Sequence, residues 1–105
     1  MKHSLTGDEF LALCEALANP HGLRLTALVA KGRQYVSQLA REAEMSRPLL
    51  YMHLQKLEKA NIVQTEMAIS DDGKAMKYYE LTDFDFQISQ ELIKEAVKTL
   101  TIKKK

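Results

Sequence analysis

The segment of residues 35–60 constrains the fold more than any other part of the 105-residue chain, because it carries two helical patterns separated by a short break. The apolar residues that recur at helical spacing before and after the break are Val36, Leu39, Ala40, Ala43, Leu50, Leu54 and Leu57. Ser46 is suited to cap the second helix with its hydroxyl, and Pro48 lies in the first turn, where its missing N–H costs no hydrogen bond. The pattern predicts two helices joined by a tight turn, which is a helix-turn-helix.

The second of these helices presents a mostly polar face opposite its leucines, and this face is a candidate DNA-binding surface. Arginine can bind guanine and glutamine can bind adenine in the major groove, while tyrosine and methionine offer apolar contact to thymine methyl groups. The candidate DNA-binding residues of this helix are Ser46, Arg47, Pro48, Tyr51, Met52, Gln55 and Lys56. The alternative interpretation is a solvated helix face in a small helical protein, so the flanking segments must decide between the two.

Composition and charge limit the class of protein. At 46% hydrophobic residues, the chain can form one globular domain with a modest core, which dimerisation would help to stabilise. The formal net charge is only +1, but residues 31–60 hold six lysines or arginines against three acidic residues. This local excess of positive charge is a weak electrostatic footprint for DNA, and a two-fold dimer would double it.

Side chains that support metal or redox chemistry are few and scattered. Cys14 is the single cysteine, so no intramolecular disulfide can form, and we interpret it as a small buried hydrophobe rather than a reactive thiol. His3, His21 and His53 lack ligand partners at metal-site spacing, so we expect no metal and no cofactor. No nucleophile–base set or phosphate-binding loop is present, so we expect no enzymatic activity. No apolar run is long enough to cross a membrane, and we expect a cytoplasmic protein without membrane partners.

Two further helices are expected before the helix-turn-helix. Residues 6–9 match a capping box, which starts the first helix. The apolar stripe of this helix consists of Phe10, Leu13, Cys14 and Leu17. Asn19-Pro20 ends the first helix and starts the second, which extends to Lys31. The residues of the second helix expected to face inward are Leu23, Ala27, Leu28 and Ala30.

The chain changes period after Asn61, which is suited to end a helix in the left-handed conformation. Residues 62–69 and 75–81 are rich in β-branched and aromatic side chains, and they flank a polar turn sequence that contains Gly73. This pattern predicts a β-hairpin. Lys74 and Lys77 of the hairpin are candidates for contact with phosphate or the minor groove, and the alternative is a plain solvated hairpin.

A last helix is predicted over residues 83–102, capped by Thr82-Asp83. Its apolar stripe is longer than one small core can cover, so we expect the stripe to form a dimer surface together with the first helix. The candidate interface residues are Phe10, Leu13, Leu17, Ile88, Leu92, Ile93, Val97 and Leu100. Intramolecular packing alone is the alternative.

Four helices, a hairpin and a last helix (α-α-α-α-β-β-α) form the order of a winged helix-turn-helix, a mostly α (α+β) fold that we expect to span residues 1–105 as one domain. The chain also resembles the ArsR-like family of transcriptional regulators in its residues. The resemblance rests on residues 16–20 (ALANP), 45–63 (MSRPLLYMHLQKLEKANIV) and 77–81 (KYYEL). It implies a homodimer that places its recognition helices in successive major grooves of a palindromic double-stranded DNA operator and represses transcription until a signal releases it.

The chain departs from this family at several positions. Metal-sensing members carry a Cys-x-Cys pair in the helix before the recognition helix, whereas residues 35–39 contain no cysteine, and the last helix lacks the ligand pairs of the family's other metal site. Glu44 and Asn61 stand where glycine is usual, and Gly22 where a larger polar residue is common. The resemblance therefore implies a member that does not sense metal, and it identifies no small-molecule inducer. A winged helix module for protein–protein or RNA binding is the alternative function.

Overall fold

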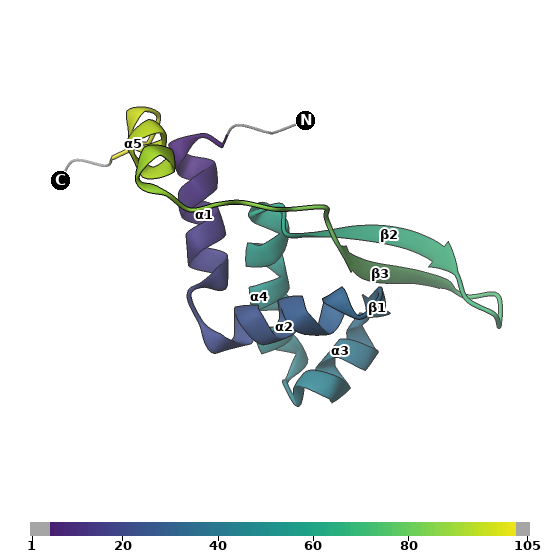
Figure 1. Ribbon diagram of the computed structural model, residues 1–105. Helices are drawn as coiled ribbons and strands as arrows, with labels where there is room; N and C mark the ends of the chain where they lie inside the picture. The colour runs from purple at the N-terminus through teal and green to yellow at the C-terminus, as the bar shows by residue number, and fades with distance from the viewer. Residues whose placement is uncertain (1–4, 103–105) are drawn as a thin grey trace.

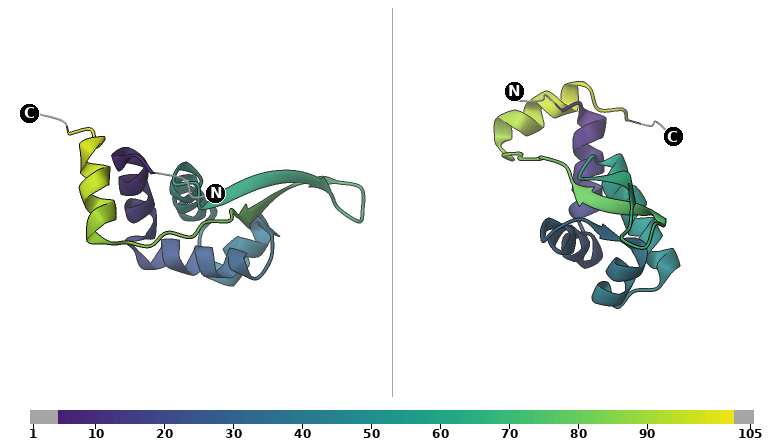
Figure 2. Two further views of the ribbon diagram at one scale, coloured as in Figure 1. Left: turned by 45° about the horizontal axis from the view of Figure 1, so that its top comes forward. Right: turned by 90° about the vertical axis from the view of Figure 1, so that its right-hand side faces the viewer.

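Five helices and three short strands follow one another in the computed structural model, which describes residues 5–102 (Figure 1). The elements are α1 (Gly7–Leu17), α2 (Pro20–Ala30), β1 (Gln34–Tyr35), α3 (Val36–Ala43), α4 (Arg47–Lys59), β2 (Val63–Ile69), β3 (Ala75–Leu81) and α5 (Gln90–Lys98). The three strands form an antiparallel sheet in the order β1-β3-β2. The hairpin of β2 and β3 projects from one end of the molecule, whereas α1 and α5 lie at the other (Figures 1 and 2). The predicted winged helix-turn-helix is confirmed.

Strand β1 is an element that the sequence pattern did not reveal, because two residues are too few to show a period. Gln34 and Tyr35 pair with Tyr79 and Tyr78 of β3. Gln34 is 8% exposed and donates from Nε2 to the Leu28 carbonyl oxygen at 2.9 Å. Strand β1 therefore ties the start of α3 to the base of the hairpin.

Side-chain caps set the starts of the first, second and fourth helices where they were predicted. The Thr6 N–H donates to the Glu9 carboxylate at 2.9 Å, and the Glu9 N–H donates to the Thr6 hydroxyl at 3.1 Å. Asn19 accepts from the Gly22 N–H at 2.8 Å, and Ser46 accepts from the Leu49 N–H at 3.4 Å. Because each cap satisfies a backbone donor that the helix leaves free, it fixes the first residue of the helix.

The last helix begins later than predicted, and the expectation of a helix over residues 83–102 is wrong. Thr82 does not cap it, because the Thr82 hydroxyl donates to the Asn61 carbonyl oxygen at 2.7 Å. Phe84 and Phe86 alternate along a segment without helix or strand and pack against the core. Ser89 is the actual cap and accepts from the Leu92 N–H at 3.2 Å. The period of two at the phenylalanines places them on one side of an extended chain.

The core lies where the helices pack against the base of the hairpin. The leucine face of α4 is buried as predicted, with Leu50, Leu54 and Leu57 each 0% exposed. Tyr79, the hairpin residue that faces inward, is 2% exposed. This packing leaves the opposite face of α4 on the surface.

Of the α2 residues predicted to face inward, Leu28 packs against the core, and the prediction is wrong for the other three. Leu25 and Val29 are buried, whereas Leu23 is 55% exposed, and Ala27 and Ala30 are also exposed. Most positions of this helix are apolar, so several rotations about its axis would bury apolar side chains equally well. Contacts with the neighbouring helices decide the rotation.

The turn between α3 and α4 contains a left-handed residue that is not glycine. Glu44 has φ 54° and ψ 51° and ends α3, and it is exposed. A side chain in this conformation costs roughly 1–2 kcal/mol relative to the right-handed region, whereas glycine adopts it freely.

Replacing Glu44 by glycine is therefore expected to raise the free energy of unfolding by about 1 kcal/mol. Urea unfolding followed by circular dichroism would show this as a higher midpoint with an unchanged slope. Glu42→Gly is the matched control, because Glu42 is an exposed residue inside α3, where glycine is expected to cost about 1 kcal/mol. Loss of stability in both variants would contradict the interpretation of the turn.

Candidate nucleic-acid interface

Helix α4 has one buried face and one exposed face. Every residue predicted to bind DNA from this helix and its cap is exposed, namely Ser46, Arg47, Pro48, Tyr51, Met52, Gln55 and Lys56. Tyr51 and Met52 are 43% and 45% exposed, which is a large apolar area for side chains at the surface of a small domain. The side chains that can contact base edges therefore lie together on the outside of the helix-turn-helix.

The hairpin carries two exposed lysines. The turn that holds Lys74 is closed by the Ser70 N–H, which donates to the Lys74 carbonyl oxygen at 2.8 Å, and by Gly73 at φ 86°. Lys77 lies on β3, with its Nζ 5.5 Å from the ring centroid of Tyr79. Burial raises the pKa of the Tyr79 hydroxyl, so this ring stays neutral beside the lysine at physiological pH.

A groove joins the helix-turn-helix to the hairpin. Its lining comes from β1, the start of α3, the start of α4 and β3, and consists of Tyr35, Val36, Ser37, Arg47, Ala75, Met76 and Lys77. The structure thus brings Arg47 and Lys77 to the same groove, whereas Gln55 and Lys74 lie outside its lining. Tyr35 and Ser37 were not predicted as site residues, because their position depends on β1.

Aromatic contacts hold the base of the hairpin next to this groove. The Arg33 guanidinium lies 4.5 Å from the ring centroid of Tyr78, and the rings of Tyr35 and Tyr78 pack edge to face at 5.8 Å. Arg33 also forms an ion pair with Glu66 at 3.6 Å, but both side chains are about half exposed, so the pair adds little stability. The aromatic contacts contribute more and orient the hairpin relative to α3.

Comparison with known proteins identifies the family. A family model described as bacterial regulatory protein, arsR family, matches residues 19–65, which include the whole helix-turn-helix. An uncharacterised HTH-type transcriptional regulator from Methanocaldococcus jannaschii is 36% identical over 81 residues, which cover 77% of this chain and 84% of that protein. The chain belongs to the ArsR family of transcriptional regulators.

Solved structures share the fold of this ArsR-family chain. NolR from Sinorhizobium fredii is 25% identical with a TM-score of 0.61, over 83% of this chain and 76% of that one. A homodimeric winged helix-turn-helix DNA-binding domain from Mycobacterium bovis, described as a possible ArsR-family regulator, is 20% identical with a TM-score of 0.63, over 87% and 74%. HlyU from Vibrio cholerae is 21% identical with a TM-score of 0.60, over 87% of both chains. The likeness covers most of this chain in each case.

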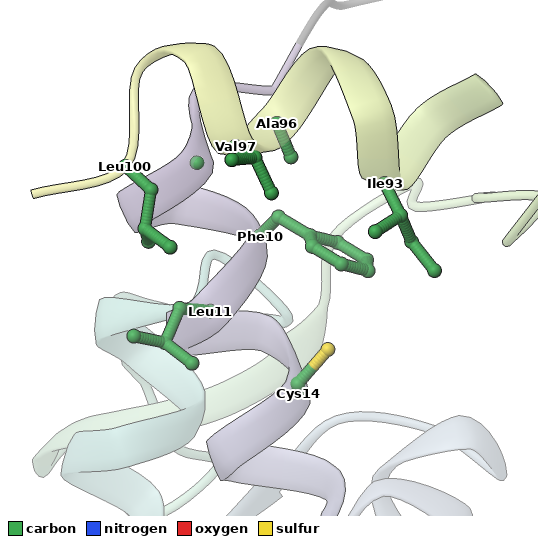
Figure 3. A pocket seen from close by; sticks show the side chains of 8 residues that line it. Phe10, Leu11, Cys14, Ile93, Ala96, Val97 and Leu100 are labelled. Atoms are coloured by element: carbon green, nitrogen blue, oxygen red, sulfur yellow. The ribbon is translucent and has the colours of Figure 1, made fainter. Parts of the chain in front are cut away.

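A second surface of the ArsR-family chain is apolar and lies between α1 and α5. Figure 3 shows the Phe10 ring between these helices, near Ile93 and Val97. The lining consists of Gly7, Phe10, Leu11, Cys14, Ile93, Ala96, Val97 and Leu100. Ile93 and Val97 are 47% and 54% exposed, which leaves an apolar strip of α5 uncovered within one protomer.

The predicted interface residues divide into three groups. Phe10, Ile93, Val97 and Leu100 line the groove, and Leu92 is partly buried but lies outside the groove lining. Leu13 is 5% exposed and is therefore removed from the candidate interface, whereas Leu17 is partly buried against the core and lies outside the groove lining. Ile88 is 63% exposed but precedes α5, outside the helix that was expected to carry it.

The two apolar sides of helix α1 explain why Leu13 was assigned to the wrong surface. The helix carries apolar residues on two sides, whereas the sequence analysis assigned them to a single apolar stripe. Leu13 and Ala16 are buried in the core, whereas Leu11 and Cys14 line the groove toward α5. The groove residues absent from the predicted interface are Gly7, Leu11, Cys14 and Ala96, of which Leu11 is 46% exposed.

Hydrogen bonds fix α5 on the start of α1. The Gly7 N–H donates to the Thr99 hydroxyl at 2.6 Å. The Asp8 carboxylate accepts from the Thr101 N–H at 2.9 Å and from the Thr101 hydroxyl at 2.7 Å, and these bonds lower the pKa of Asp8. A Cβ atom on Gly7 would lie 2.1 Å from the Ala96 carbonyl oxygen, so only glycine permits this approach of the two helices.

Residues 5–102 contain neither a cluster of metal-ligating side chains nor a membrane-spanning helix. No group of three or more His, Cys, Asp or Glu in this range has the geometry to hold a metal ion. His3 lies outside the described residues. None of the helices in the same range has the length and apolar content needed to cross a bilayer.

Proposed function

We propose that this ArsR-family regulator is a homodimeric repressor that binds a palindromic double-stranded DNA operator, with α4 as the recognition helix in the major groove. The observation that carries the proposal is the contrast between the two faces of α4. Leu50, Leu54 and Leu57 are 0% exposed and anchor the helix, while side chains able to bind bases project from the other face. A rigid support of this kind positions base-contacting groups without a large ordering cost.

The roles of the exposed residues follow from their chemistry. Arg47 is proposed to bind guanine and Gln55 adenine, with Tyr51 and Met52 against thymine methyl groups. Ser46 and Pro48 set the angle at which the helix enters the groove. The proposed contacts with phosphate or the minor groove are those of Lys56, Lys74 and Lys77.

A homodimer is proposed because one copy has little charge to bind DNA. The chain carries a formal net charge of +1, and phosphate contacts provide much of the affinity of DNA-binding proteins. The groove between α1 and α5 offers Ile93 and Val97 for self-association, and the homodimeric domain from Mycobacterium bovis shares the fold. A dimer seated on a palindrome would occlude the DNA beneath it, which favours repression over activation.

Selection of bound DNA from random duplexes tests the proposal. We expect a palindromic consensus whose half-sites lie about 34–36 Å apart, together with an affinity that falls steeply with salt. Absence of any sequence preference would reject operator recognition. A protein–protein or RNA-binding module would instead show weak duplex binding at physiological salt.

Arg47→Ala is expected to weaken operator binding by about 1–3 kcal/mol and to relax the preference at one base pair of each half-site. Gln55→Ala is expected to do the same at a different base pair. Fluorescence anisotropy with the selected operator and its single-base variants would measure both effects. A sequence preference that survives both substitutions would remove these residues from base recognition.

Lys74→Ala is the contrasting variant, because Lys74 is proposed to contact the backbone. It is expected to lower the affinity for all sequences by a similar factor and to reduce the slope of log affinity against log salt by about 1. A shift in sequence preference with this variant would contradict the assignment.

A further inference from the structure

Two histidines meet where the proposed recognition helix packs on α2. His21 is the second residue of α2 and His53 lies on the buried side of α4, and their ring centroids are 5.1 Å apart with the planes tilted by 47°. His53 is 6% exposed. His21 Nδ1 is buried and has no hydrogen-bond partner. The contact therefore leaves His21 Nδ1 without a hydrogen-bond partner and keeps most of the His53 ring away from water.

The charged groups around the pair do not favour protonation. His21 across the interface and Lys56 one turn along α4 are the charges that act on His53. Neither ring forms an ion pair with a carboxylate within residues 5–102. The ionisable groups on the elements packed against α4 are exposed except for the partly buried Cys14; they are Asp8, Glu9, Cys14, Glu15, Arg24, Arg41, Glu42 and Glu66. The remaining groups of α4 itself are Arg47, Tyr51, Glu58 and Lys59.

Protonation of the pair carries three costs. An imidazolium at His53 would be a charge in a largely dehydrated site. A proton on His21 Nδ1 would create a buried N–H donor without an acceptor. If both rings were charged, like charges would face each other at the 5.1 Å contact, so the two protonations oppose one another.

We propose that the His21–His53 contact is a proton-sensitive element that loosens the packing of α4 on α2, and so weakens DNA binding, as the pH falls through the range in which free histidine protonates. The effect on DNA rests on the proposed function, whereas the effect on folding does not. Because Arg47, Tyr51 and Gln55 project from the same helix, a shift of α4 would move all of them relative to the DNA.

The direction of the pH dependence follows from the pKa of His53. Burial lowers this pKa below its usual 6.5, and the charges of His21 and Lys56 lower it further. The unfolded chain then binds a proton more readily than the folded one. The stabilising contribution is fully present above pH 6.5 and is lost as the pH falls from there through the folded pKa.

Urea unfolding of the wild type, His21→Gln, His53→Gln and the double variant between pH 7.5 and pH 5.0 tests the effect on folding. Glutamine keeps a polar side chain but does not titrate. We expect the unfolding constant of the wild type to rise by at least about threefold more than that of the double variant over this range. His3→Gln, the same substitution at the third histidine, should behave as the wild type. Equal pH dependence in the wild type and double variant would overturn the proposal.

Two measurements on other observables complete the test. Histidine ring NMR titration of the wild type should show at least one ring with a depressed pKa, and normal titration of all three rings would overturn the proposal even if the variants fail to fold. Operator affinity measured at pH 7.5 and 5.5 should fall more in the wild type than in the double variant. An absence of operator binding at both pH values would reject the proposed function, while the unfolding and NMR results would still decide the role of the histidine pair.

Discussion

Val97→Glu is expected to convert the protein from a dimer to a monomer and to weaken operator binding by about a hundredfold or more. Val97 is 54% exposed and lines the apolar groove between α1 and α5. In the proposed dimer this position becomes covered, so the glutamate would bury a charge without a partner on each protomer. Glutamate is a good helix former, and α5 should stay folded. Sedimentation velocity at micromolar concentration and anisotropy with the operator would measure both effects.

Gln90→Glu is the matched control for this variant. Gln90 is exposed in the first turn of α5 and lies outside the groove lining, and the substitution changes the net charge by the same amount. This control should remain a dimer. A wild-type protein that sediments as a monomer and still binds an operator tightly would show that both the interface and the palindrome are wrong.

Gly22→Ala is expected to lower the free energy of unfolding by about 3 kcal/mol, at the upper end of the usual cost of overpacking. A Cβ atom on Gly22 would lie 2.1 Å from the Ala16 carbonyl oxygen, and this atom belongs to the backbone of α1 and cannot rotate away. In an open helix the same substitution would stabilise by roughly 1 kcal/mol. The contact between α1 and α2 therefore makes Gly22→Ala destabilising rather than stabilising.

Ala27→Gly provides the comparison within the same helix. Ala27 is exposed in the interior of α2, where glycine should cost about 1 kcal/mol through helix propensity alone. Urea unfolding should thus show that Gly22→Ala and Ala27→Gly both lower the free energy of unfolding. A higher urea midpoint for Gly22→Ala would mean that α1 and α2 separate without cost.

Features that depend on a few neighbouring residues were predicted well from the sequence. The starts of three helices follow from side chains that bond the backbone three residues ahead, as Asn19 does with Gly22. The positive φ values of Asn61 and Gly73 also follow from local preference. The helix-turn-helix was predicted from the cap at Ser46 and from the helical spacing of the leucines, which form the buried face of α4.

Features that depend on contacts between distant segments were not predicted. The rotation of α2 and the division of α1 into two apolar sides are set by which helices pack against them. Ser89 caps α5, while the hydroxyl of Thr82, the predicted cap, bonds to the Asn61 carbonyl oxygen in another part of the chain. Likewise, the groove shared by Arg47 and Lys77 exists because β1 holds the hairpin beside α3. The prediction of the exposed face of α4 did not depend on such contacts, and its residues are exposed as the helical period indicates.

Helix α1 contacts both the helix proposed to bind DNA and the helix proposed to form the dimer. It packs against α4 on one side, and its Gly7 and Asp8 bond Thr99 and Thr101 at the end of α5 on the other (Figure 2). In a dimer formed through α5, both copies of α1 would lie between the two copies of α4, so α1 would contribute to the distance between them. In the proposed dimer, the tilt of α1 would set the spacing of the operator half-sites, so a change at Gly7, far from any proposed base contact, is expected to alter which operators the protein accepts.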